Sequence, residues 1–219
     1  MDLRAKLRYL TDIFRSHGLR EAVRSAWVGL RFRGESRKIL FALYAPRPMP
    51  DAVEAARNHD FRFATAEEME RLARTPAYEI APIDIARVRS GIARCMLQMD
   101  GDRLVGYAWI WTNRLAFIED GVHLNLPDDT IYNYKAYTNP EYRGYGFQAL
   151  RHLNLLRLTA GEGVRRLFGF VDHFNTRSLH GVRKSGYVPV GSIRIRRRDG
   201  RVRLVVEVQQ DFWSDAART

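Results

Sequence analysis

The stretch YTNPEYRGYGFQAL, residues 137–150, passes from the end of a strand-like segment through a glycine-bearing turn into a segment with helical apolar periodicity. Glycines such as Gly144 and Gly146 allow a tight turn with exposed amides, and the following helix adds unpaired N–H donors and the positive end of its dipole. A pyrophosphate fits such a nest of amides. We therefore predict a phosphate cradle over Pro140 to Leu150, although a plain strand-to-helix connection would also fit these residues.

The spacing excludes two familiar phosphate-binding loops. The stretch lacks the Gly-Lys-Ser/Thr ending of a Walker loop, and it lacks the first glycine and the spacing of a dinucleotide fingerprint.

A second stretch, NTRSLHGVRKSGY at residues 175–187, also carries a recognisable pattern. In this stretch Asn175 is suited to open a helix that continues to Lys184, and Gly186 is suited to stop it.

Together the two stretches resemble the coenzyme A-binding elements of the GNAT (Gcn5-related N-acetyltransferase) superfamily. The first resembles the pattern Q/R-x-x-G-x-G/A after a strand: Arg143 and Gly146 match it, whereas Gln148 stands where the pattern has Gly or Ala. The second resembles N-x-x-A/S-x-x-L-Y-x-K-x-G-F, with Val182 where many members have a tyrosine that protonates the departing thiolate. Gln148 and Val182 are the departures that matter for function.

The resemblance implies an α/β fold with a mixed, mainly antiparallel central sheet flanked by helices. It also implies an acyl-CoA-dependent N-acyltransferase, in which an amine attacks the thioester of acetyl-CoA or another acyl-CoA directly, without a metal. Because valine cannot donate a proton, a different group would protonate the thiolate, or the thiolate leaves with help from solvent or a helix dipole, or the domain binds an acyl-CoA without catalysis. The residues that the resemblance assigns to coenzyme A binding are Thr138, Arg143, Gly144, Tyr145, Gly146, Phe147, Gln148, Asn175 and Ser178.

Three residues are candidates for proton transfer in such a reaction. His173 follows the strand predicted over 166–171, Tyr134 lies on the strand predicted over 131–138, and Glu119 precedes that strand. Each has a plainer interpretation, respectively a capping or surface histidine, a core tyrosine and a solvated loop carboxylate. Strict strand alternation would place Tyr132 and Tyr134 on one face with Thr138.

The remaining elements follow from local patterns. Thr65 and Glu68 have the spacing of a capping box for a helix that continues to about Arg74. Asp100-Gly101 and Asp199-Gly200 have the turn chemistry of hairpins. The predicted elements, in order, are strands 61–64, 93–99, 103–111 and 131–138, helix 148–160, strand 166–171, helix 175–184, and strands 188–197 and 201–209.

Three regions are expected along the chain. A basic helical extension and linker cover residues 1–60, with helices from Leu3 and from Leu19 and a strand from Ile39 to Tyr44. The GNAT-like domain covers 61–210, and a tail covers 211–219. The two N-terminal helices could pack on the domain or lie on an anionic membrane surface.

Composition limits the partners and the compartment. The net charge of +11 favours an anionic partner, and the single cysteine, Cys95, excludes an intramolecular disulfide. The mixed charges near Met1 argue against a signal peptide, so we expect a cytoplasmic protein, with peripheral attachment to the inner face of the membrane left open. The expected acceptor is a small or lipid-linked amine, and a homodimer is left open. An acyl-CoA-binding or nucleic-acid-binding domain is the alternative, although no nucleic-acid-binding motif accompanies the arginines of 194–203.

Overall fold

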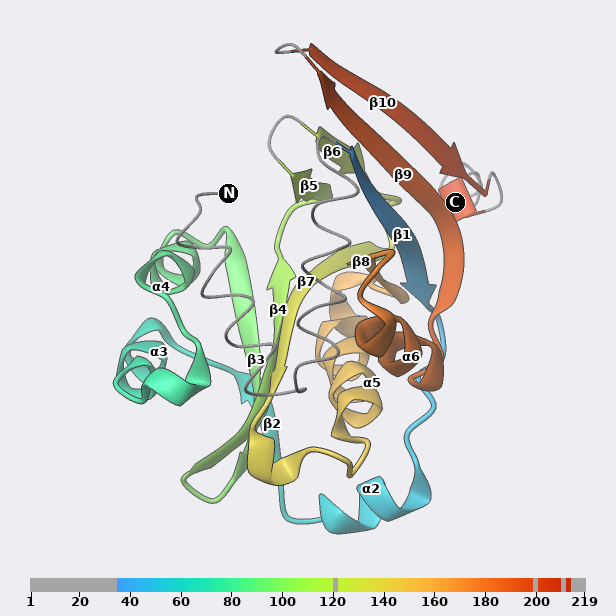
Figure 1. The fold of residues 1–219 in the computed structure, drawn as a ribbon. Coiled ribbons are helices and arrows are strands. Elements are labelled where there is room, and N and C mark those ends of the chain that lie inside the picture. Colours follow the sequence, from blue (N-terminus) through green and yellow to red (C-terminus); the bar gives the residue numbers. More distant parts are fainter. Residues whose placement is uncertain (1–34, 120–121, 199–200, 210–211, 214–219) are drawn as a thin grey trace, which may run out of the picture.

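The computed structural model describes residues 35–119, 122–198, 201–209 and 212–213, so the helices expected from Leu3 and Leu19 lie outside the described residues (Figure 1). Its strands are β1 (Glu35–Leu43), β2 (Asp60–Phe63), β3 (Ala93–Asp100), β4 (Arg103–Trp111), β5 (Leu115–Glu119), β6 (Val122–Asn125), β7 (Thr130–Thr138), β8 (Arg166–Asp172), β9 (Val188–Arg198) and β10 (Arg201–Val208). Its α-helices are α2 (Pro50–Ala55), α3 (Ala66–Ala73), α4 (Pro82–Arg89), α5 (Phe147–Thr159) and α6 (Thr176–Lys184).

Eight of these strands form one sheet, in the order β10-β9-β1-β8-β7-β4-β3-β2, while β5 and β6 form a separate hairpin. Every neighbouring pair in the large sheet is antiparallel except β7 and β8, which run parallel. The prediction of a mixed, mainly antiparallel sheet flanked by helices is therefore confirmed.

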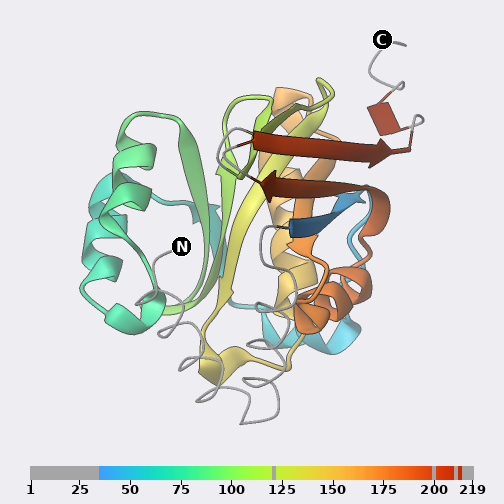
Figure 2. The same cartoon turned by 45° about the horizontal axis from the view of Figure 1, so that its top comes forward.

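Helices cover both faces of this sheet (Figures 1 and 2). On one face, Leu155 of α5 packs with Ala108 of β4 and Leu167 of β8. On the other, Met69 of α3 packs with Tyr107 and Trp109 of β4. The two aromatic residues of β4 thus line a core face under a helix, while Ala108 and Ile110 face α5.

Strand β1 is an internal strand of the sheet, between β8 and β9. It pairs with β8 from Lys38 opposite Asp172 to Leu43 opposite Leu167, and with β9 from Glu35 opposite Arg196. Its apolar run 40–43 is completely buried or nearly so. The domain expected to begin at residue 61 therefore takes a central strand from the segment that the sequence assigned to an extension.

Local signals predicted several boundaries well. The Thr65 hydroxyl accepts from the Glu68 amide while the Glu68 carboxylate accepts from the Thr65 amide, which confirms the capping box. Gly101 has a φ of 56°, as the Asp100-Gly101 turn requires.

The sequence analysis did not predict α2, α4 or the β5–β6 hairpin. Helices α2 and α4 are short, and each begins at a proline.

The position of β1 yields a first prediction. Leu40 is completely buried and packs with residues of β7, β8 and β9. Replacing it by alanine leaves a cavity, so Leu40→Ala should lower the free energy of unfolding by about 2–5 kcal/mol. Urea denaturation measures this change, with the exposed neighbour Tyr44→Ala as the control. Equal, small effects of the two substitutions would contradict an internal β1.

Candidate functional site

The site begins where β7 and β8 part. These strands pair only from Thr130 opposite Arg166 to Tyr132 opposite Phe168. Beyond that point β7 follows β4 and β8 follows β1, so the gap between them widens. Gly169 stands at the start of the gap, where a Cβ atom would lie 3.2 Å from the carbonyl oxygen of Asn133.

A cavity of about 260 Å³ occupies the gap. Its walls come from β7, β8, α5 and α6, with one residue of β1 and one residue between α6 and β9, and they carry both polar and apolar side chains. The residues that line it are Phe41, Asn133, Tyr134, Lys135, Ala136, Thr138, Gln148, Arg151, His152, Gly169, Phe170, Val171, Ser178, Val182 and Tyr187. We call this cavity the cleft.

A β-bulge in β7 changes which side chains face the cleft. Trp109 of β4 pairs with Lys135 and Ile110 pairs with Asn133, so Tyr134 is the extra residue. Lys135 binds Asp84 of α4 on one face of the sheet, whereas Thr138 contacts Arg151 of α5 on the other. The Tyr134 ring lies against Trp109 and the Arg87 guanidinium, on the same face as Lys135, so the expectation that Tyr134 shares a face with Thr138 is wrong.

The cradle residues surround the start of α5. Gly144 and Gly146 have φ angles of 94° and 78°, and Gly146 is the N-cap residue, with no side chain that could cap the helix. Within the described part of the chain, the amides of residues 144–148 have no hydrogen-bond acceptor. Unpaired amides at a helix N-terminus attract anions.

The side chains of the cradle are arranged around these amides. The Arg143 Nε donates to the Thr138 carbonyl over 3.1 Å, so this arginine braces the turn at the strand end. Tyr145 is half exposed and stacks on the buried ring of Phe147. Gln148 lines the cleft, as does Thr138.

Helix α6 forms the opposite wall. The Asn175 side chain accepts from the Ser178 amide over 3.0 Å, which confirms its role at the helix start. Ser178 and Val182 line the cleft one turn apart. The structure thus brings the two sequence motifs together on either side of one cavity.

The three candidates for proton transfer are placed differently. Tyr134 lines the cleft, but its hydroxyl is buried without a hydrogen-bond partner, and burial raises its pKa although the charge of Arg87 opposes this. His173 lies outside the cleft lining, and its ring Nδ1 is 3.2 Å from the carbonyl oxygen of Arg37. Glu119 ends β5 in the separate hairpin, and its side chain is not among those that the structure describes.

Sequence reasoning missed a buried polar network under α5. Arg151 is 1% exposed, and its guanidinium donates to the Gln98 side chain over 3.0 Å and to the Thr138 hydroxyl. No carboxylate pairs with Arg151 among the described residues, and burial lowers its pKa to about 10. The signal was present, since Arg151 is four residues from both Phe147 and Leu155 and so interrupts an apolar helix face.

His152, the next residue, is the second missed group. It is 1% exposed and lines the cleft, yet neither ring nitrogen has a hydrogen-bond partner. The edge of its ring meets the ring of Tyr187, with centroids 5.3 Å apart. Burial, and secondarily the charge of Arg151, lower its pKa to about 3, so the imidazole is neutral at physiological pH.

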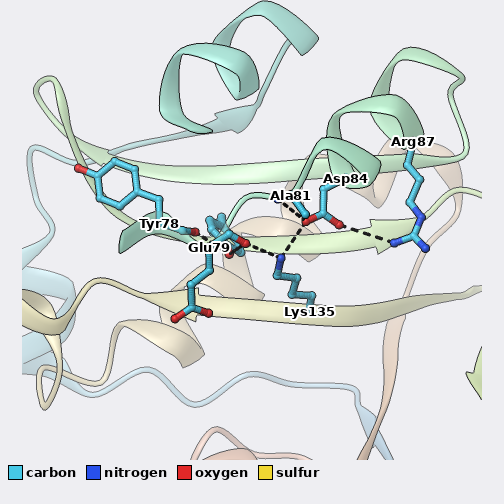
Figure 3. Close-up of polar contacts among 7 residues, drawn as sticks. Tyr78, Glu79, Ala81, Asp84, Arg87 and Lys135 are labelled. Carbon is cyan, nitrogen blue, oxygen red and sulfur yellow. Dashed lines mark hydrogen bonds and ion pairs between the residues drawn. The ribbon is translucent and has the colours of Figure 1, made fainter. Parts of the chain in front are cut away.

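The other face of β7 holds α4 through an ion pair (Figure 3). Lys135 Nζ lies 2.8 Å from an Asp84 carboxylate oxygen and 2.8 Å from the Glu79 carbonyl oxygen. Asp84 is nearly fully buried, accepts from the Ala81 amide and lies 3.6 Å from Arg87. These contacts attach α4 and the loop before it to the bulged segment of β7.

Metal-binding clusters and membrane-spanning helices are both absent from the described ranges. Residues 35–119, 122–198, 201–209 and 212–213 contain no group of three His, Cys, Asp or Glu side chains suited to hold a metal ion. No helix in the same ranges is both long enough and apolar enough to cross a membrane.

The lowered pKa of His152 predicts how stability depends on pH. The unfolded chain takes up a proton near pH 6.5, whereas the folded protein resists it down to about pH 3, so stability falls as the pH drops through this window. For this group the loss is about 2 kcal/mol between about pH 7 and about pH 5. Urea denaturation at both pH values should show that His152→Leu removes this part of the loss. The exposed His180→Leu is the control, and an equal pH dependence in wild type and His152→Leu would contradict the assignment.

Comparisons with known proteins concern the fold. No family model matches the chain, and no curated protein matches it. A conserved protein of unknown function from Staphylococcus epidermidis ATCC 12228 is similar in structure, with a TM-score of 0.50, 14% identity, and coverage of 83% of this chain and 66% of that one.

Two aminoglycoside acetyltransferases are also similar in structure. One, from an uncultured soil metagenomic sample and in complex with trehalose, has a TM-score of 0.46 and 8% identity, and the match covers 59% of this chain and 88% of that one. The other, AAC(6')-Iy in complex with a bisubstrate analogue of coenzyme A, has a TM-score of 0.46 and 14% identity, with coverage of 59% and 90%. With its mixed, mainly antiparallel sheet, its parallel β7–β8 pair and the cleft between those strands, this chain has the α/β fold that its resemblance to the GNAT superfamily implies.

Proposed function

We propose that this protein is an acyl-CoA-dependent N-acyltransferase that moves an acetyl or longer acyl group to an amine. The observation that carries the proposal is the continuity of two features: unpaired amides at the start of α5, and a cleft that runs from Gln148 at this helix start between the diverging strands. A ligand with a phosphate-bearing head and a long uncharged arm matches this combination, because the amides attract the anionic head and the cleft has both polar and apolar walls for the arm.

The residues present fit coenzyme A. The amides of 144–148 would hold the pyrophosphate, and the positive end of the α5 dipole supports the same charge. Gln148, which departs from the family pattern, lines the cleft beside α6, and a Cβ atom at Gly181 would lie 3.5 Å from its side-chain oxygen. Ser178 and Thr138 line the same cavity and offer hydroxyl groups to the pantetheine arm.

Acyl transfer forms an N–C bond and breaks the C–S bond, while one proton leaves the amine and one reaches the sulfur. When bound, the thioester supplies an activated acyl carbonyl. This chain would contribute the bulged backbone at Tyr134, which has no partner in the β4–β7 ladder and lines the cleft, as a site for stabilising developing negative charge.

The sulfur needs a proton donor other than Val182. Tyr187 lines the same cleft, and burial raises its pKa, so its hydroxyl stays protonated. We assign the donor role to Tyr187 in this proposal. Among the candidates from sequence, Tyr134 borders the cleft but its ring lies on the sheet face opposite Thr138, and His173 does not line the cleft. We propose that the proton of the attacking amine is taken up by water or by a group near the acceptor.

The acceptor is proposed at the level of an amine, either a small molecule or a lipid-linked amine. The lipid-linked variant is the one that the charge of +11 favours, since it would draw the protein to an anionic surface. Thiol release from acetyl-CoA and longer acyl-CoAs with a panel of amines tests the reaction. Calorimetric titration that finds no binding of any acyl-CoA would rule the proposal out.

A charge at the cradle gives a sharper test. Gln148→Glu keeps the side-chain shape and places a negative charge in the first turn of α5, where it favours the helix but repels phosphate. We expect an unchanged or higher Tm and an affinity for coenzyme A at least about tenfold weaker, because repulsion between the new carboxylate and the phosphates costs about 1.4 kcal/mol or more. The control Gln209→Glu makes the same charge change at an exposed position away from the cleft. Equal coenzyme A affinity in all three proteins would contradict the cradle.

A further inference from the structure

The imidazole of His152 presents an unusual combination for a buried side chain. Buried polar groups in folded proteins nearly always have hydrogen-bond partners, because leaving one unpaired is costly. His152 is 1% exposed, and both of its ring nitrogens lack a partner. The described chain around it supplies the edge contact with the Tyr187 ring and no hydrogen bond. A ligand in the cleft is the remaining source of partners.

The position of His152 indicates which part of a ligand it would meet. Gln148, in the cradle turn of α5, and His152, four residues later, lie on the same face of the helix, and both line the cleft. His152 is therefore one helical turn farther into the cleft than the unpaired amides. A ligand whose phosphates occupy the cradle would present the segment beyond its phosphates to His152.

The chemistry of the His152 ring indicates which kind of ligand group could pair with both of its nitrogens. A neutral imidazole has one N–H donor and one nitrogen acceptor. The adjacent guanidinium of Arg151 and the burial both favour this neutral form. A secondary amide carries the complementary pair, a C=O acceptor and an N–H donor. Charged groups are a poorer match, since the ring brings no charge of its own.

We propose that His152 is a binding residue for the amide-bearing arm of the ligand, and that its ring nitrogens pair with the pantetheine amides of coenzyme A. This inference rests on the proposed function, because it takes coenzyme A as the occupant of the cleft. In the ligand-free protein the two nitrogens stay unpaired. His152 thus lowers the stability of the free protein and raises its affinity for the ligand.

The test compares two ligands and three variants by calorimetric titration. The ligands are coenzyme A and 3′-phospho-ADP, the fragment that keeps the phosphates and lacks the pantetheine arm. His152→Leu should bind coenzyme A about tenfold more weakly than wild type, the effect of losing a hydrogen bond or two, and bind the fragment equally well. His152→Gln keeps a donor and an acceptor and should recover most of the affinity. His180→Leu, on the exposed face of α6, should match wild type.

Thermal unfolding of the ligand-free proteins supplies the second readout. His152→Leu should have a Tm at or above that of wild type, because the substitution removes unpaired polar atoms and breaks no hydrogen bond. A clear fall in its Tm, or a failure to fold, would overturn the proposal by showing that the ring is structural. Unchanged affinity for coenzyme A, or an equal loss for both ligands, would also overturn it. If wild type binds the fragment and coenzyme A equally, only this inference fails; if it binds neither, the proposed function fails with it.

Discussion

The arrangement of the site depends on one constraint: β7 pairs with β4 on one side and with β8 on the other, and it cannot stay beside both strands along its whole length. It follows β4 from Trp111 to Gly106 in an antiparallel ladder, but it keeps its parallel pairing with β8 for three residues only. A parallel pair that continued would leave no space between the strands. The cleft and its position beside α5 and α6 follow from this early separation, and the bulge at Tyr134 lies just beyond the last parallel pair.

A buried cation maintains the other wall of the cleft. Arg151 connects α5 to Gln98 of β3 and to Thr138 at the end of β7, and Gly106 provides the space, since a Cβ there would lie 2.7 Å from the guanidinium. Removing a charge from water is expensive, and hydrogen bonds to neutral partners recover only part of that free energy. The network therefore holds the strand end and the helix in one arrangement more than it adds to stability, and its charge helps to keep the neighbouring imidazole neutral.

The sequence predicted the parts of the site that depend on short-range chemistry. The glycines of the cradle, the cap at Asn175 and the Asp100-Gly101 turn each need a residue type at one position, so their patterns are visible without a structure. The bulge at Tyr134 was not visible, because it depends on the register of β4 against β7. Arg151 and His152 were overlooked for a related reason: the spacing of Arg151 from Phe147 and Leu155 puts it on an apolar helix face, but only the packed sheet shows what these two side chains meet there.

The internal position of β1 also has a consequence for how the chain reaches this structure. Its partners, β8 and β9, lie more than a hundred residues later in the sequence, so β1 cannot complete its ladders until the residues of β9 have left the ribosome. Contacts this distant in sequence slow folding, because the chain loses the entropy of closing the long connecting loop before the strand contacts form and compensate for it. Until then, the apolar run at 40–43 is an unpaired strand that can pair with other chains, so this segment is exposed to aggregation during synthesis.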